Sequence, residues 1–170
     1  MINTVKLQEN GYLVNGSISI PNDSNNRHYK EVQEWLKTNT PEQEFSIEEI
    51  KSQKINEINT LCSGQIISGF TSIALDTATP TTYHYQSEQI DQLNLIGLVS
   101  GGVDDVLKCS KDDGNGNPTT WNYELHTIAQ LTQVLNDGKA YKISLLTKAA
   151  DLKVQVEAAA TQAELDAIVW

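Results

Sequence analysis

The segment SIEEIKSQKINEINTLCSGQIISG, residues 46–69, decides the fold of the larger part of the chain. It opens with Ser46 and Glu49, the spacing of a capping box, in which a hydroxyl and a carboxylate bind backbone groups at a helix start. Isoleucines and Cys62 then recur at mostly helical steps as far as Gly69. The segment therefore predicts one long helix.

Upstream, residues 5–21 carry two Asn-Gly dipeptides, at positions 10–11 and 15–16, each flanked by alternating apolar and polar residues. Asn-Gly favours type I′ turns, because both central residues of such a turn need positive φ. We expect at least one hairpin, ended at Pro21, which lacks the N–H that a ladder needs. The apolar residues expected on one of its faces are Val5, Leu7, Ile18 and Ile20.

A short helix should follow this hairpin. Residues 22–26 supply cap-forming side chains, and Tyr29, Val32 and Trp35 follow at near-helical spacing within residues 27–37. Pro41 ends the helical pattern, and residues 38–45 form a polar linker. The chain is therefore expected to have two domains, a hairpin–helix module over residues 1–45 and a larger domain over residues 46–170.

The larger domain mixes helices with short strands. Threonine-rich residues 70–85 predict extended segments around a turn, and residues 87–100 predict a helix stopped by two glycines. Residues 103–110 and 119–125 predict a hairpin with a polar tip. A capping box at residues 127–130 predicts the start of a helix that ends at Gly138, and another at residues 161–164 predicts the start of a short final helix. Between them, residues 139–160 carry an apolar stripe at helical spacing. These patterns predict an α+β fold, a mainly helical body with short β-hairpins, about half of the chain being helical.

The charge of the chain limits its partners. Twelve Lys and Arg residues stand against 22 Asp and Glu residues, a net charge of −10 in 170 residues. Nucleic acid and anionic membranes are therefore poor partners, and no apolar run approaches the roughly 20 residues that span a bilayer. The first residues show no secretion signal, so we expect synthesis in a cytoplasm and no membrane insertion.

No combination of residues predicts catalysis, a metal site or a cofactor. His28, His84 and His126 share no ligand spacing, which favours surface or capping roles, and Cys62 and Cys109 read as small buried side chains rather than a disulfide. There is no nucleophile elbow and no phosphate-binding loop.

Acidic residues offer two further candidate sites. A glycosidase needs two facing acids, but Glu48-Glu49 fits a helix start, and Asp104-Asp105 and Asp112-Asp113 fall in predicted turns. Residues 113, 115, 117 and 124 imitate the ligand spacing of a calcium loop, between Asp113 and Glu124. Pro118 stands where that loop needs glycine, which favours a plain hairpin tip over calcium.

Aromatic residues give the candidate interaction sites. The chain closes with Ile168, Val169 and Trp170, and a terminal Trp needs either a pocket in its own domain or one in a neighbouring protein. Tyr29 and Trp35 have the same alternatives: they cover their own hairpin, or they dock on another protein.

Several motifs resemble tailed-phage and prophage proteins of unassigned domain function that are encoded beside tail-fibre genes. The resemblance covers residues 12–170 and is carried by residues 26–36, 39–41, 54–56, 69–72, 91–95, 125–127, 130–131 and 166–170. It implies a tail-fibre or tail-fibre-assembly protein, and it transfers no catalytic residue.

The resemblance and the residues together lead to one expectation of function. We expect a non-enzymatic structural or adaptor component of a phage tail, located in the virion and bound to tail-fibre or baseplate proteins, with homo-oligomerisation open. The alternative is an assembly chaperone that caps the fibre and then leaves. The third hypothesis is a glycan hydrolase.

Overall fold

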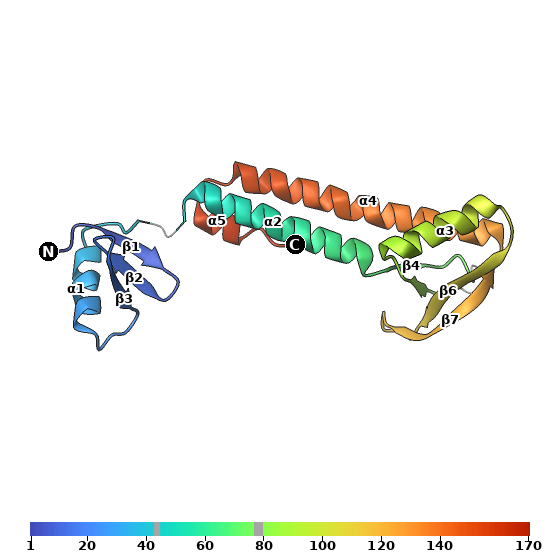
Figure 1. The fold of residues 1–170 in the computed structure, drawn as a ribbon, viewed down its shortest axis with the longest axis horizontal. Coiled ribbons are helices and arrows are strands. Elements are labelled where there is room, and N and C mark those ends of the chain that lie inside the picture. Colours follow the sequence, from blue (N-terminus) through green and yellow to red (C-terminus); the bar gives the residue numbers. More distant parts are fainter. Residues whose placement is uncertain (43–44, 77–79) are drawn as a thin grey trace. The chain divides into compact units, whose positions relative to one another are not determined.

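The computed structural model describes residues 1–42, 45–76 and 80–170 and shows an α+β protein with antiparallel sheets (Figure 1). The residues expected to be extended include 77–79, and the expected linker includes 43–44; these lie outside the described ranges. The fold divides into two compact units, residues 1–52 and 53–170. The division falls within the first long helix, a little after the predicted boundary at residues 45 and 46.

The first unit contains a three-stranded antiparallel sheet in the order β1 (Val5–Gln8), β2 (Gly11–Val14) and β3 (Ile18–Pro21). Asn15 and Gly16 form the second turn with φ of 51° and 69°, as the dipeptide predicts. The first turn differs, because Gln8 pairs with Gly11 and the turn is made by the two residues between them. Gly11 is needed there for another reason: a Cβ would lie 2.0 Å from the Ile20 carbonyl oxygen.

Helix α1 (Arg27–Leu36) completes this unit. The Asn26 side chain caps it by accepting hydrogen bonds from the backbone N–H groups of His28 and Tyr29. The core consists of Val5, Val14, Ile20 and Val32. Ile18, which we expected in the apolar face, is 54% exposed, because it opens the edge strand of the sheet.

The predicted linker does not run free over its whole length. The backbone of Glu42 accepts a hydrogen bond from Leu7 and donates one to Val5, at 2.8 and 2.7 Å. Residue 42 therefore lies beside β1 as a short parallel bridge.

The second unit is built on two long helices, α2 (Ile47–Ile67) and α4 (Ile128–Ala158), which run antiparallel side by side (Figure 1). The Cys62 thiol contacts the Leu145 carbonyl oxygen at 3.7 Å and joins the two helices. Ser46 and Glu49 form the predicted capping box at the start of α2. Buried side chains follow both helices and the short α5 (Gln162–Asp166): Ile58, Cys62, Leu145, Ala149, Leu152, Val156 and Leu165.

Beyond one end of this helix pair lies a four-stranded antiparallel sheet in the order β4 (Phe70–Ser72), β5 (Tyr83–Tyr85), β6 (Asp105–Asp112) and β7 (Pro118–His126). Helix α3 (Gln89–Gly101) connects β5 to β6 and ends at Gly102 in the left-handed conformation. The sheet and helices share one apolar core, formed by Ala74, Tyr85, Leu95, Cys109, Leu131 and Val134. Cys62 and Cys109 are both buried and free of disulfides, as predicted.

The predicted break at Gly138 is wrong. Helix α4 continues through this residue, which lies against the ring of Phe70. A Cβ on Gly138 would lie 2.9 Å from the Phe70 ring, so glycine here permits close packing of a helix on a side chain.

Candidate interaction surface

One face of the β6–β7 hairpin exposes apolar side chains in the half away from the hairpin tip. Across the two strands Val106 pairs with Leu125, and Lys108 pairs with Tyr123. Sequence periodicity predicts these strand positions, but Tyr123 is 71% exposed and Leu125 is 66% exposed. Residues of this kind normally pack in a core or against a partner.

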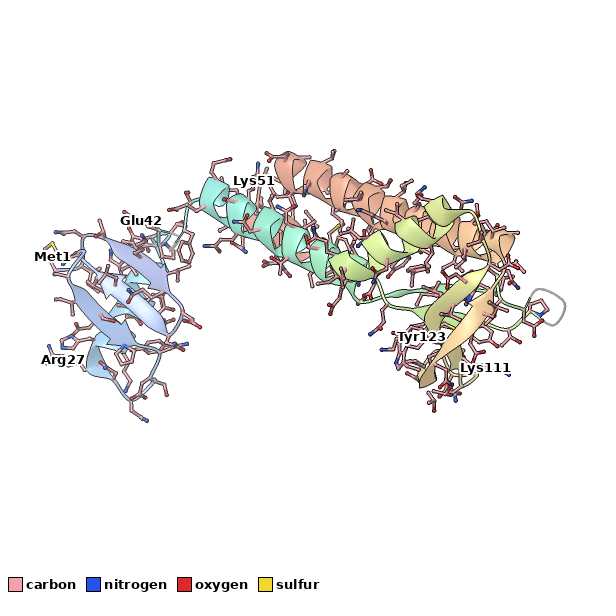
Figure 2. The ribbon with its side chains drawn as sticks, turned by 45° about the vertical axis from the view of Figure 1, so that its right-hand side comes forward. Met1, Arg27, Glu42, Lys51, Lys111 and Tyr123 are labelled. Carbon is pink, nitrogen blue, oxygen red and sulfur yellow. The ribbon has the colours of Figure 1, made fainter. Side chains whose placement is uncertain are left out.

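Helix α3 adds a second apolar face. Ile90, Leu93 and Ile96 are all exposed, at successive helical steps of three residues. Between α3 and the hairpin lies a groove of about 430 Å³, bordered by Leu93, Asn94 and Gly97 on the helix and by Val106, Lys108 and Tyr123 on the strands. Tyr123 is labelled on the hairpin in Figure 2. We call this feature the α3–hairpin groove.

The candidate site residues of the sequence analysis lie elsewhere. Tyr29 and Trp35 are half-buried and pack on the core of the first unit. In the second unit Ile168 is buried and Val169 is exposed, while the half-buried ring of Trp170 lies 4.7 Å from the Lys148 ammonium nitrogen. The Trp170 indole nitrogen is buried and finds no hydrogen-bond acceptor in the described part of the chain.

The prediction that all three histidines are surface or capping residues is wrong for His126. Its ring is fully buried, with Nδ1 2.8 Å from the Glu124 carbonyl oxygen and Nε2 3.0 Å from the Tyr85 hydroxyl. Because a carbonyl only accepts, Nδ1 carries the proton and Nε2 accepts from Tyr85. Burial lowers the pKa of His126 and raises the pKa of Tyr85.

The other two histidines contact carboxylates. His84 Nε2 lies 2.7 Å from the Asp112 carboxylate, and this bond lowers the pKa of Asp112. The exposed His28 lies 3.2 Å from Glu31.

The paired acids bind backbone N–H groups. Asp104 accepts from Ile128 at the start of α4, at 2.8 Å, and the backbone N–H of Gly114 donates to Asp112 at 2.7 Å. The backbone N–H groups of Asn115 and Asn117 donate to Asp113, which lowers its pKa. These carboxylates close turns and helix ends, and across the described residues no three His, Cys, Asp or Glu side chains gather as a metal site.

Sequence reasoning missed the α3–hairpin groove, although a signal was present. Helix α3 carries apolar residues on more than one face, since Leu95, Leu98 and Val99 pack in the core while Ile90 and Leu93 do not. A helix that is apolar beyond a single stripe needs a second surface to cover it.

A comparison with known protein families assigns the second unit to a family. The family described as "Domain of unknown function (DUF4376)" matches residues 49–169. The chain belongs to this family. The DUF4376 region starts in the first turn of α2 and contains the α3–hairpin groove, whereas the sheet of the first unit lies outside it.

The other comparisons add nothing to the DUF4376 assignment: no curated protein and no solved structure matches the chain. Within residues 1–42, 45–76 and 80–170, none of the helices is both long and apolar enough to cross a membrane.

Proposed function

We propose that the chain is a non-enzymatic structural or adaptor component of a bacteriophage tail, bound to tail-fibre or baseplate proteins through protein–protein contacts. The resemblance of its motifs to tail-fibre-associated proteins supports the setting, and the α3–hairpin groove supports the mode of action. In this proposal the protein acts in the virion after synthesis in the bacterial cytoplasm.

The observation that carries the proposal is the grouping of exposed apolar side chains around one groove. Leu93 on α3 and Val106 and Tyr123 on the hairpin come from separate segments, yet they border the same depression. Contiguous apolar surface of this kind, with polar groups such as Lys108 between, is typical of a protein-binding site.

The polar chemistry of the second unit supports binding over catalysis. Asp104, Asp112 and Asp113 hold backbone N–H groups, and His126 is buried with both ring nitrogens bonded. A hydrolase would need two acids directed at a shared cleft. These acids instead fix the hairpin tip and the start of α4.

Quantitative mass spectrometry of purified virions tests the proposal. We expect the chain at a constant copy number per particle. Its absence from virions, together with its presence on unassembled fibres in infected cells, would refute the adaptor role and favour the assembly chaperone.

A pair of variants tests the groove. Leu93→Glu places a charge at the groove and should abolish incorporation into virions, because burying an unpaired carboxylate at an interface is costly. Val154→Glu makes the same change at an exposed position of α4 outside the groove and should leave incorporation unchanged. Equal incorporation of both variants would refute the role of the groove.

A further inference from the structure

One row of side chains crosses all four strands of the second sheet. Thr71 on β4 lies opposite His84 on β5. Ser110 on β6 lies opposite His84 on one side and opposite Trp121 of β7 on the other. Residues paired in this way direct their side chains to the same face of the sheet, where they lie side by side. Residues from four separate strands are therefore brought together on the face opposite the apolar core.

A pocket of about 310 Å³ is built on this row. Thr71, His84 and Trp121 line it, together with Tyr141 of α4 and Pro118 beside the hairpin tip. Its volume lies at the lower end of the range of small-molecule sites, about 300–1,000 Å³. Among the described residues that line this pocket there is no Asp, Glu, Lys or Arg. We call it the Trp121 pocket, and its lining suits an uncharged ligand.

His84 supplies a fixed hydrogen-bond acceptor. Its Nε2 lies 2.7 Å from the Asp112 carboxylate, which stays ionised because hydrogen bonds lower its pKa. A carboxylate only accepts, so Nε2 carries the proton, and Nδ1 of the neutral ring is an acceptor. Nδ1 has no partner within the described residues and is not a buried atom. Asp112 also accepts from the backbone N–H groups of Gly114 and Gly116, which ties His84 to the hairpin tip.

Trp121 supplies a hydrogen-bond donor and a flat apolar surface. In the described part of the chain its indole N–H has no acceptor, and unlike that of Trp170 it is not buried. Tyr141 adds a second, exposed ring. The Lys108 ammonium nitrogen lies 5.9 Å from the centre of the Trp121 ring, so a positively charged ligand would be repelled. The pocket thus combines aromatic rings with one free donor and one free acceptor.

We propose that the Trp121 pocket binds a neutral saccharide, with a pyranose ring against the Trp121 indole and sugar hydroxyls bonded to the indole N–H and to His84. One side of a pyranose is a surface of C–H groups, which pack well on the negative face of an aromatic ring. A hydroxyl both donates and accepts, so one sugar can satisfy both free groups of the pocket. The proposal goes beyond the tail role and does not depend on it or on the α3–hairpin groove.

A proline-rich peptide is the main competing ligand, because such peptides also bind aromatic pockets. Its carbonyl groups could accept a hydrogen bond from the Trp121 indole. Proline has no N–H, however, so a polyproline segment would cover His84 Nδ1 without offering it a donor, and an unpaired buried acceptor is costly. The two free groups together therefore favour the saccharide.

A nuclear magnetic resonance titration of the full ¹⁵N-labelled chain tests the proposal. The chain has three tryptophans and so three indole N–H signals, of which those of Trp35 and Trp170 arise outside the pocket and serve as internal references. The probes are the methyl glycosides of glucose, galactose, mannose and N-acetylglucosamine, and an all-proline peptide. We expect at least one glycoside to shift the Trp121 signal in a saturable way and to leave the two reference signals in place.

Variants test where the sugar binds, with affinity measured by saturation transfer to the sugar protons. Trp121→Ala should abolish binding, and His84→Leu should weaken it about tenfold through the lost acceptor. Tyr123→Ala is the matched control, because it removes an exposed aromatic ring from the same face of β7 outside the pocket, and it should bind as the wild type does. If circular dichroism shows that Trp121→Ala unfolds, Tyr141→Ala at the exposed border of the pocket replaces it and should also weaken binding.

Three results would overturn the proposal: no saturable shift with any of the glycosides, equal shifts of all three indole signals, or wild-type affinity in the pocket variants. A response of Trp121 to the proline peptide alone would also overturn it and would assign the pocket to peptide recognition.

Discussion

Replacing Gly138 by alanine tests the packing of α4 on the sheet. In an open helix interior this change stabilises a protein by about 1 kcal/mol, because alanine has the higher helix propensity. Here the added methyl carbon would lie 2.9 to 3.2 Å from three atoms of the Phe70 ring. The ring has little room to move, since it stacks on Tyr85 at 5.6 Å, and Tyr85 is hydrogen-bonded to the buried His126.

Overpacking of this kind costs about 1–3 kcal/mol. With the propensity gain subtracted, we expect Gly138→Ala to lower the free energy of unfolding by about 1 kcal/mol. Gly64→Ala in α2 is the matched control, because no atom lies within 4 Å of its added Cβ. It should stabilise the protein, so the two variants should differ by about 2 kcal/mol.

Urea denaturation followed by helical circular dichroism measures both variants, since α2 and α4 dominate that signal. The double variant Gly138→Ala with Phe70→Leu should recover part of the loss, because a smaller side chain accommodates the methyl group. Equal stabilisation by Gly138→Ala and Gly64→Ala would refute the argument and show that the Phe70 ring moves freely.

Four further predictions concern other parts of the chain. The folded-state pKa of His126 lies below its ordinary 6.5, so the unfolded chain binds this proton more readily than the folded chain. The free energy of unfolding should therefore be constant above about pH 6.5 and fall as the pH drops toward the folded-state pKa. Urea titrations between about pH 7.5 and 5.5 check this slope, which His126→Gln should lack. Thr127→Ala removes the capping box of α4 and should cost about 1 kcal/mol in the same assay; no loss would show that Asp104 caps the helix alone. Asn15→Ala loses side-chain bonds to residues 1, 3 and 4 and places alanine at positive φ, so hydrogen exchange in β1 and β2 should accelerate while α4 stays protected. Trp170→Ala should lower stability, because the ring packs beneath Lys148; if stability and virion incorporation are both unchanged, neither the core role nor the docking role of Trp170 survives.

Local signals predicted most of the fold. The three capping boxes that open at Ser46, Thr127 and Thr161 all form, and Asn15-Gly16 makes its expected turn. These features were predictable because each depends on residues within four positions of one another. The break expected at Gly138 failed because the reason for that glycine is Phe70, 68 positions away in the sequence.

The burial of His126 and the α3–hairpin groove could not be predicted for the same reason, because both are set by contacts between segments that are distant in the sequence. The alternation of Trp121, Tyr123 and Leu125 predicts a strand with one apolar face, and periodicity is identical whether that face meets a core or solvent. Only the tertiary structure decides the question: the face of the hairpin that carries Cys109 meets the core, and the face that carries Tyr123 and Leu125 is exposed. The docking roles considered for Tyr29, Trp35 and Trp170 stay predictions, because half-burial within a unit is compatible with a further contact.

The distribution of polar groups in this acidic chain supports the proposed binding role. Its turns and helix starts are closed by carboxylates, so Asp104, Asp112 and Asp113 have their oxygens engaged by backbone N–H groups. Hydrogen bonds to the charged form hold the pKa of Asp112 and Asp113 low, so these groups stay ionised and are poor proton donors near neutral pH. Apolar side chains, by contrast, are left uncovered at the groove and along β7, where desolvation by a partner is favourable. This contrast supports the proposed role of the second unit as a protein that packs against other proteins.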